Sequence, residues 1–181
     1  MSSLISMGQK AKEASYELGV ASPGQKNEAL TFMAEELIKA KEEIIKANEI
    51  DRQNAIKKGI TDALLDRLSL DDSRIEAMAQ GLLDIVKLQD PVGEVTNMWQ
   101  MPNGLQIGQK RVPIGVLGII YESRPNVTSD AAGLCLKSGN AVILRGASDA
   151  INSNKAVAKA LVAGIKRSGL PQDCVQLLPL F

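Results

Sequence analysis

The chain has 181 residues, of which 45% are hydrophobic and 23% charged, as expected for a soluble globular domain. Its 21 Lys and Arg residues balance its 21 Asp and Glu residues, so charge gives no argument for a nucleic-acid or membrane partner, and we expect neither. Histidine is absent, which excludes Ser-His-Asp and Cys-His catalysis, histidine-ligated zinc and an imidazole base.

The N-terminus and the cysteines point to a cytoplasmic protein. Residues 1–6 lack a basic stretch followed by an apolar run, so no secretion signal is predicted. Cys135 and Cys174 lie far apart in the sequence and are predicted to be reduced thiols. The longest apolar run, 112–121, is broken by proline and glycine and is too short to span a bilayer.

The first half of the chain is predicted to be helical. Apolar residues recur with helical spacing over 25–48, and Ser22-Pro23 is typical of an N-cap followed by a first-turn proline. A second helix is predicted over 48–58, with Gly59 at its end. The expected apolar positions of the first helix are Leu30, Met33, Leu37, Ile44 and Ile45.

Two more helices are predicted before the pattern changes. A short one covers 61–67, and the next begins at Asp71, whose carboxylate can accept from the free amides of the first turn. Asp90-Pro91 should close this helix, because a residue that precedes proline avoids the helical region. Its expected buried stripe is Ile75, Met78, Leu82 and Val86. We expect these helices to pack on a sheet with their charged faces in solvent.

Residues 93–113 are predicted to form a β-hairpin. Strand-like runs at 94–101 and 105–112 flank Pro102-Asn103-Gly104, and Asn-Gly between such runs is a strong hairpin signal. Two strands are not stable alone, so the hairpin must lie on another sheet or another subunit. We therefore expect it to serve oligomerisation.

The remainder of the chain alternates strands and helices. The β-branched run at 114–121 suits a strand buried on both faces, and we expect Thr128 or Ser129 to cap the next helix, with Asp130 in its first turn. This alternation predicts an α/β fold with a parallel sheet. The predicted elements are a strand at 114–121, a helix at 127–137, a strand at 141–144, a helix at 152–168 and a strand from Val175.

Polar side chains gather where two of these strands end. Residues 121–126 (YESRPN) follow one strand and residues 145–148 (RGAS) follow the next, and ligands of open parallel sheets bind at this edge. Arginine side chains there suit a phosphorylated or carboxylated ligand, and the helix after Asn126 offers free backbone amides. Alternatively, Arg124 merely pairs with Glu122 or Asp130, and residue types alone favour neither reading.

The sequence predicts neither a glycine-rich nucleotide-binding motif nor a reactive cysteine. Neither a G-x-G-x-x-G segment nor a Walker lysine loop follows the strand at 114–121. Cys135 lies between two leucines of a helix and Cys174 at the start of a strand, so both are expected to be packing residues. No catalytic residue and no metal site is predicted.

The string RVPIGVLGIIYESRPNVTSDAAGLCLKSGNAVILRG, over 111–146, resembles the γ-glutamyl phosphate reductase family, also called glutamate-5-semialdehyde dehydrogenase. Its most distinctive pieces are YESRPNVT, LCLKSGNA and VILRG. The similarity extends back through LLDRLSL and LQDPVGEV and forward to SGLPQDCVQLL, so it covers nearly the whole chain.

The resemblance implies an α/β, aldehyde dehydrogenase-like fold, in which N-terminal helices and a β-hairpin lead into an incomplete parallel nucleotide-binding sheet. It implies NADPH-dependent reduction of L-glutamyl 5-phosphate to L-glutamate 5-semialdehyde, with release of phosphate, in proline biosynthesis. In the family, a cysteine thiolate displaces phosphate to give a thioester, which hydride from NADPH then reduces. A cytoplasmic homo-oligomer with glutamate 5-kinase as a partner is also implied.

The resemblance assigns roles to residues at the predicted edge. Arg124 and Asn126 are expected to bind substrate, Arg124 through an anionic group and Asn126 through a carbonyl or developing oxyanion. An arginine at position 145 suits the 2′-phosphate of NADPH. The expected cofactor-binding residues are Tyr121, Glu122, Leu144, Arg145, Gly146 and Ser148.

We expect three segments: helices over 1–92 that pack on the nucleotide-binding domain, the hairpin over 93–113, and an incomplete Rossmann-like domain over 114–181. The family's catalytic cysteine lies in a second domain, which we expect beyond Phe181, so the chain alone is expected to be inactive. Residues 178–181 fit the family less well than those before them. An unpaired apolar edge of the sheet would invite aggregation or pairing with another chain.

Several readings of this chain stay open. The first is the reductase activity of the family, and the second is a binding module that retains nucleotide affinity without turnover. The third is a structural role in which the helices and the hairpin serve assembly only. An oxidising aldehyde dehydrogenase is a weaker rival, because YESRPN replaces the usual proline–aromatic–asparagine loop of those enzymes.

Overall fold

The computed structural model describes residues 2–179. The helices of the first half are α1 (Ser2–Val20), α2 (Pro23–Lys39), α3 (Lys41–Lys57), α4 (Asp62–Leu68) and α5 (Asp72–Lys87). The elements that follow are β1 (Val95–Gln100), β2 (Gln106–Lys110), β3 (Val116–Ile120), α6 (Asn126–Lys137), β4 (Ala141–Arg145), η1 (Ser148–Ala150), α7 (Ile151–Arg167), η2 (Gln172–Cys174) and β5 (Val175–Leu177). Helices α1 to α5 precede the first strand, and strands and helices alternate after β3. Among the described residues, no helix is long and apolar enough to cross a membrane.

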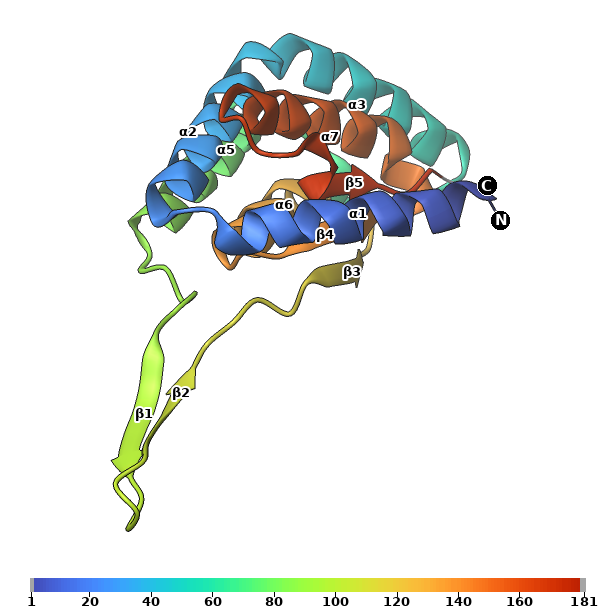
Figure 1. The fold of residues 1–181 in the computed structure, drawn as a ribbon. Coiled ribbons are helices and arrows are strands. Elements are labelled where there is room, and N and C mark those ends of the chain that lie inside the picture. Colours follow the sequence, from blue (N-terminus) through green and yellow to red (C-terminus); the bar gives the residue numbers. More distant parts are fainter. Residues whose placement is uncertain (1, 180–181) are drawn as a thin grey trace.

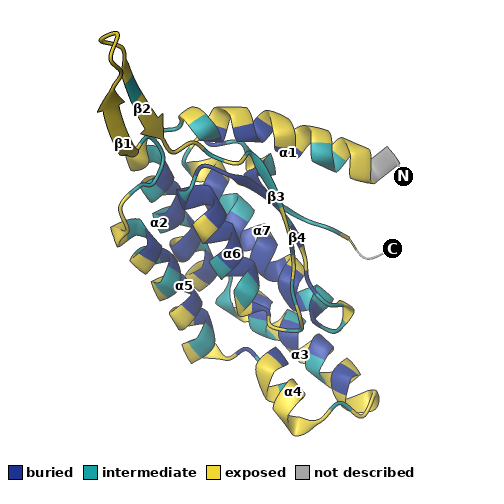
Figure 2. Ribbon diagram, turned by 90° about the horizontal axis from the view of Figure 1, so that it is seen from below, coloured by how far each residue is buried: buried dark blue, intermediate teal, exposed yellow. Residues whose placement is uncertain are grey.

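The predicted parallel sheet is confirmed. Strands β3, β4 and β5 lie in this order, with Val116 paired to Ala141 and Val142 paired to Val175. Helix α1 packs against all three strands on one side, whereas α6 and α7 contact strands from the other side (Figure 2). Helices α2, α3 and α5 form a further layer over α6 and α7 (Figure 1). A large apolar cluster of mostly aliphatic residues runs through these layers, and a small second cluster contains Ala55, Leu68 and Ala150.

The predicted burial of the strand at 114–121 is wrong. Ile114 is 79% exposed and Ile120 is 76% exposed, because β3 lies at the edge of the sheet with a neighbour on one side only. The central strand β4 is the one that is enclosed, with Val142 and Leu144 fully buried. An apolar sequence indicates that a strand is suited to burial. It does not indicate whether a second strand pairs with it, and in these described residues β3 pairs only with β4.

The helix boundaries of the first half differ from the predicted ones. The chain breaks at Ala40 rather than at Asn48, which lies inside α3 and is buried. A polar residue at this position suggests a helix end in the sequence. In the structure, the Asn48 side-chain amide donates to the Leu68 carbonyl at 2.8 Å. Helix α1 was not predicted, since its buried stripe consists largely of alanine.

Two predicted helix starts are confirmed by hydrogen bonds. The Ser22 hydroxyl accepts from the Gln25 amide at 3.2 Å, and the Asp71 carboxylate accepts from the Arg74 amide at 2.8 Å. Helix α5 ends at Lys87, three residues before the predicted stop at Asp90.

The predicted cap of α6 by Thr128 or Ser129 is wrong. The helix begins at Asn126, directly after Pro125, so Asp130 lies beyond its first turn. The Ser129 hydroxyl instead donates to the Asn126 carbonyl at 2.8 Å, and Thr128 is fully buried.

The predicted hairpin is confirmed, and it projects away from the rest of the chain (Figure 1). Strands β1 and β2 pair antiparallel, with Trp99 opposite Ile107, in a sheet separate from β3, β4 and β5. A buried ion pair between Lys26 Nζ and Asp90 Oδ2, at 2.5 Å, holds the segment that leads into the hairpin. The exposed apolar side chains of the hairpin are Val95, Met98, Trp99, Met101 and Leu105.

Candidate functional site

The carboxyl ends of β3 and β4 bring the two predicted polar segments together. Ile120 pairs with Arg145 in the sheet, and the Tyr121 amide donates to the Arg145 carbonyl at 3.1 Å. The loop at 121–126 therefore starts beside the segment at 145–148, as the sequence predicts. Arg124 and Arg145 are both exposed at this edge.

A polar network fixes the start of the loop. The Tyr121 hydroxyl lies 2.7 Å from Thr128 Oγ1, which donates to Asn154 Oδ1 at 3.1 Å. Burial raises the pKa of Tyr121, although the hydrogen bond with Thr128 opposes the shift. A Cβ at Gly146 would overlap the Asn154 amide and lie 3.1 Å from the Tyr121 ring. Glycine at 146 is therefore required by packing.

The predicted cofactor residues differ widely in accessibility. Glu122, Arg145 and Ser148 are exposed, whereas Tyr121 is half-buried and Gly146 is buried. Leu144 is fully buried in the core, and its carbonyl accepts from the Leu178 amide at 2.8 Å. Its side chain is therefore not free to touch a ligand at this edge.

The predicted substrate residues line a pocket of about 460 Å³, which we call the α4–α5 pocket. It lies between α4, α5, the loop that carries Arg124 and the start of α6. Its lining residues are Asp66, Arg67, Ser69, Leu70, Arg74, Ala77, Met78, Arg124, Asn126 and Asp130. The structure thus joins Arg124 and Asn126 to residues of the helical first half, for which the sequence suggested no role.

Arg124 makes no ion pair with Glu122 or Asp130. No carboxylate oxygen of the described residues lies within 4.0 Å of its guanidinium, so the alternative pairing that the sequence left open is not formed. Its backbone amide donates to the Glu122 carbonyl at 2.8 Å and so shapes the loop. The guanidinium is left available to an external anion.

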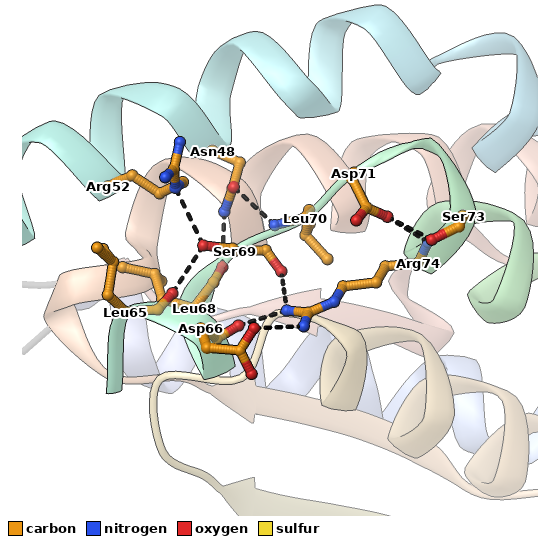
Figure 3. A network of polar contacts seen from close by, with 10 residues as sticks. All are labelled: Asn48, Arg52, Leu65, Asp66, Leu68, Ser69, Leu70, Asp71, Ser73 and Arg74. Carbon is orange, nitrogen blue, oxygen red and sulfur yellow. Dashed lines mark hydrogen bonds and ion pairs between the residues drawn. The ribbon is translucent and has the colours of Figure 1, made fainter. Parts of the chain in front are cut away.

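One wall of the α4–α5 pocket is held rigid by hydrogen bonds (Figure 3). Arg74 donates to the Ser69 carbonyl at 2.8 Å and to the Asp66 carboxylate at 2.7 Å, and it also contacts the Asp66 carbonyl. Asn48 Oδ1 accepts from the Leu70 amide at 2.8 Å. Because Arg74 and Asp66 form an ion pair with each other, they shape the pocket wall and offer no unpaired charge to a ligand.

Asp130, on α6, also lines the α4–α5 pocket. Its carboxylate accepts from Asn126 Nδ2 at 3.2 Å and faces α5 at Gly81. Burial raises the pKa of Asp130, and the hydrogen bond from Asn126 offsets part of this shift. For the wall formed by α4, the sequence signal that could have identified it is the string LLDRLSL, which carries Asp66 and Arg67.

A second hollow of about 340 Å³, the outer pocket, adjoins the same loop. Its lining residues are Leu64, Arg67, Glu122, Ser123, Arg124 and Ala147. Arg67 and Arg124 line both pockets, and Ala147 belongs to the predicted cofactor segment. The two arginines therefore lie between the α4–α5 pocket and the carboxyl end of β4.

Both cysteines are packing residues, as predicted. Cys135 is 4% exposed and Cys174 is fully buried. Burial raises the pKa of Cys135 to about 11 and that of Cys174 to about 12. At neutral pH both remain thiols, so neither is placed to act as a nucleophile.

Several γ-glutamyl phosphate reductases are similar to this chain in sequence. A γ-glutamyl phosphate reductase of Clostridium beijerinckii is 69% identical over 178 residues, which is 98% of this chain and 43% of that protein. The γ-glutamyl phosphate reductase of Halothermothrix orenii is 58% identical over 97% of this chain and 42% of its own length. The chain thus spans less than half of the curated relatives that it matches. No family model matches it.

Solved structures give the same result. The γ-glutamyl phosphate reductase of Thermotoga maritima superposes with a TM-score of 0.94 at 44% identity, covering 97% of this chain and 42% of that one. The Saccharomyces cerevisiae enzyme gives 0.90 at 34% identity, over 96% and 45%. A probable aldehyde dehydrogenase of Listeria monocytogenes gives 0.74 at 14% identity, over 98% and 36%, so the fold is aldehyde dehydrogenase-like.

Proposed function

We propose, on the premise that this chain shares its sequence and fold with γ-glutamyl phosphate reductases over nearly its whole length, that it forms the ligand-binding edge for their reaction. The reaction is NADPH-dependent reduction of L-glutamyl 5-phosphate to L-glutamate 5-semialdehyde and phosphate, a step of proline biosynthesis. The observation that carries this proposal is the 69% identity over 98% of the chain, which includes the whole carboxyl edge of the sheet.

The substrate roles rest on the loop at 121–126. Arg124 has a free guanidinium that faces the α4–α5 pocket, where it would hold an anionic group of the substrate. Asn126 lines the same pocket, and its side-chain amide would donate to the substrate carbonyl as negative charge develops on the oxygen. The hydrogen bond from Asn126 to Asp130 would hold that amide in place.

The cofactor role rests on the segment at 145–148. Arg145 is exposed and has no carboxylate within 4.0 Å in the described part of the chain, so it fits the 2′-phosphate of NADPH. Ser148 and Glu122 are exposed beside it and would hydrogen-bond the ribose. Bound NADPH would supply the hydride. Tyr121 and Gly146 would shape the surface against which the cofactor rests, and Leu144 would support it from the core.

Nucleophilic catalysis is not assigned to either cysteine of this chain. Both thiols are buried and stay protonated at neutral pH. We therefore expect the isolated chain to bind ligands without turning them over, which keeps a binding module as the second candidate function. The nucleophilic cysteine of the reaction would come from outside these 181 residues.

Assembly and location complete the proposal. The exposed apolar side chains of the hairpin would pack against another subunit in a homo-oligomer. Glutamate 5-kinase would be a partner, since it makes an acyl phosphate that hydrolyses readily in water. We propose a cytoplasmic location, in keeping with the two unpaired cysteines.

Calorimetric titration with NADPH and NADH tests the cofactor role. Arg145→Ala should weaken NADPH binding roughly tenfold, the loss of one exposed charge-assisted contact, and leave NADH nearly unchanged. Arg111→Ala, at an exposed arginine paired with Glu94, is the matched control and should change neither affinity. Equal weakening of both nucleotides by Arg145→Ala would contradict the assignment.

An activity assay tests the absence of a nucleophile. The chain, mixed with glutamate 5-semialdehyde, NADP and phosphate, should give no NADPH. Turnover by a Cys135→Ser, Cys174→Ser double variant would contradict the proposal that the reaction needs a cysteine nucleophile.

A further inference from the structure

The charges around the α4–α5 pocket do not all neutralise one another. Asp66 and Arg74 form an ion pair within its wall, at 2.7 Å. Arg67, Arg124 and Asp130 also line the pocket, and within residues 2–179 none of these three has an oppositely charged group within 4.0 Å. The pocket thus presents two free guanidinium groups and one free carboxylate.

The free carboxylate is the more unusual of these groups. Asp130 is partly buried, and its one side-chain hydrogen bond comes from the neutral amide of Asn126, at 3.2 Å. Burial disfavours the charged form and so raises the pKa of this carboxyl, and a cation placed beside it would stabilise the carboxylate. Although arginines line the same pocket, no lysine or arginine nitrogen of the described chain lies within 4.0 Å of the Asp130 carboxylate. A ligand that brings its own positive charge would satisfy it.

We propose that the α4–α5 pocket recognises the α-amino-acid end of the substrate, with the α-carboxylate bound by Arg67 and Arg124 and the α-ammonium group bound by Asp130. This inference rests on the proposed function and adds Arg67 and Asp130 to it as specificity-determining residues. It names the ligand class as an acidic L-α-amino acid or its acyl derivative.

The carboxylate argues against a bare phosphate as the ligand. A phosphate dianion bound between Arg67 and Arg124 would share the pocket with Asp130, and like charges repel in a partly desolvated site. A zwitterion meets both signs of charge at once. The arginines also line the outer pocket beside Ala147, so the amino-acid end would lie next to the proposed cofactor segment.

The test compares three ligands that differ by one charged group. The isotopically labelled 181-residue chain is titrated by NMR with L-glutamate, with glutarate, which lacks the ammonium group, and with 4-aminobutyrate, which lacks the α-carboxylate. L-Glutamate should bind roughly tenfold or more tightly than either analogue, the effect of one charge-assisted contact. Inorganic phosphate is titrated in parallel and should bind more weakly than L-glutamate.

Substitutions assign each charge to its residue. Asp130→Asn, which keeps the shape of the side chain, should reduce L-glutamate affinity to that of glutarate and should not weaken glutarate. Arg67→Gln should weaken L-glutamate and glutarate alike. Arg111→Gln makes the same change of charge at an exposed arginine that does not line the pocket, and it should alter neither affinity. Thermal unfolding of each variant checks that it is folded.

Equal affinities for L-glutamate and glutarate would overturn the inference, as would tighter binding of phosphate or the absence of any L-glutamate shift at these residues. NADPH titration separates this failure from failure of the proposed function. NADPH binding without discrimination between L-glutamate and glutarate would refute only the amino-acid pocket. Discrimination without NADPH binding would support the pocket and refute the cofactor edge.

Discussion

At the scale of single residues, Gly164 allows a close approach of α7 to the backbone of α2. A Cβ at this position would lie 2.5 Å from the Met33 Cα and 2.7 Å from the Phe32 carbonyl carbon, which are both backbone atoms. Helix α2 cannot relax by rotating a side chain, so Gly164→Ala should reduce the free energy of unfolding by about 3 kcal/mol. Urea denaturation measures this loss.

Gly8→Ala is the matched control, because Gly8 lies inside α1 and a Cβ there has no atom within 4 Å. The same substitution should stabilise the protein by roughly 0.5 kcal/mol, since alanine is the better helix former. Destabilisation of both variants to a similar extent would show that the α2–α7 contact is not the cause.

The buried thiols make a prediction about pH. The folded state raises the pKa of Cys135 to about 11 and of Cys174 to about 12, above the ordinary thiol value of 9.0. The unfolded chain therefore loses these protons first, and the stabilising contribution, complete below pH 9, is lost as pH rises toward 11. Urea titrations at pH 8 and pH 10 should show the decrease.

A Cys135→Ala, Cys174→Ala double variant is the control and should lose less stability between these two pH values. The same burial predicts that neither thiol reacts with a disulfide reagent at pH 8 until denaturant is added. Rapid reaction of either cysteine in the native protein would contradict its placement in the core.

Sequence reasoning predicted two of the four residues that we propose to bind the ligand in the α4–α5 pocket. Arg124 and Asn126 follow a strand end, where a general rule for parallel sheets indicates binding. Arg67 and Asp130 could not be identified in the same way, because they lie on two helices far apart in the chain. Only the packing of α4 and α6 around one hollow brings these side chains together.

At the scale of elements, the start of α7 is capped by a residue of α3. The buried Asp51 carboxylate accepts from the Ser153 amide at 2.7 Å, the Ser153 hydroxyl at 2.6 Å and the Asn152 side chain at 2.7 Å. Asp51→Ala would leave these buried donors unsatisfied. The expected loss is about 3 kcal/mol of unfolding free energy, measured by urea denaturation.

Asp84→Ala provides the comparison, because Asp84 lies on an exposed turn of α5 and pairs only with its own helix neighbours. The midpoint of thermal unfolding of the Asp84→Ala variant should equal that of the unsubstituted chain within the scatter of replicate measurements. A similarly small effect of Asp51→Ala would mean that α7 does not need this cap.

The capping of α7 explains why the boundaries of the first helices could not be predicted. Asn48 interrupts the apolar pattern and so suggests a helix end, whereas both Asn48 and Asp51 are buried inside α3. Their partners, Leu68 and Ser153, lie far along the chain. Local features such as Ser22, Asp71 and the Asn-Gly turn were read correctly, because each acts on its immediate neighbours.

At the scale of the whole molecule, the hairpin is the feature that most requires a partner. It stands away from the remaining elements, with Trp99 43% exposed and Met98 63% exposed (Figure 1). We predict that the chain self-associates through this hairpin and that Trp99→Glu shifts the population toward monomer in sedimentation velocity. Ile56→Glu, at an exposed apolar side chain of α3, should leave the population unchanged.

The overall architecture was predictable because alternating strands and helices permit few topologies. The parallel order of β3, β4 and β5 follows from that rule. The exposure of β3 does not, since it depends on what lies beside the sheet rather than on the strand's own composition.

The central claim is that the carboxyl ends of β3 and β4 bind NADPH. NMR titration of the labelled chain tests it directly, because it reports where the nucleotide binds. The amides at 121–126 and 145–148 should shift together and saturably. A separate hollow of about 440 Å³ beside β5, lined in part by Lys155, Lys159 and Lys166, should remain unaffected. Shifts confined to that hollow, or no shifts at all, would contradict the account.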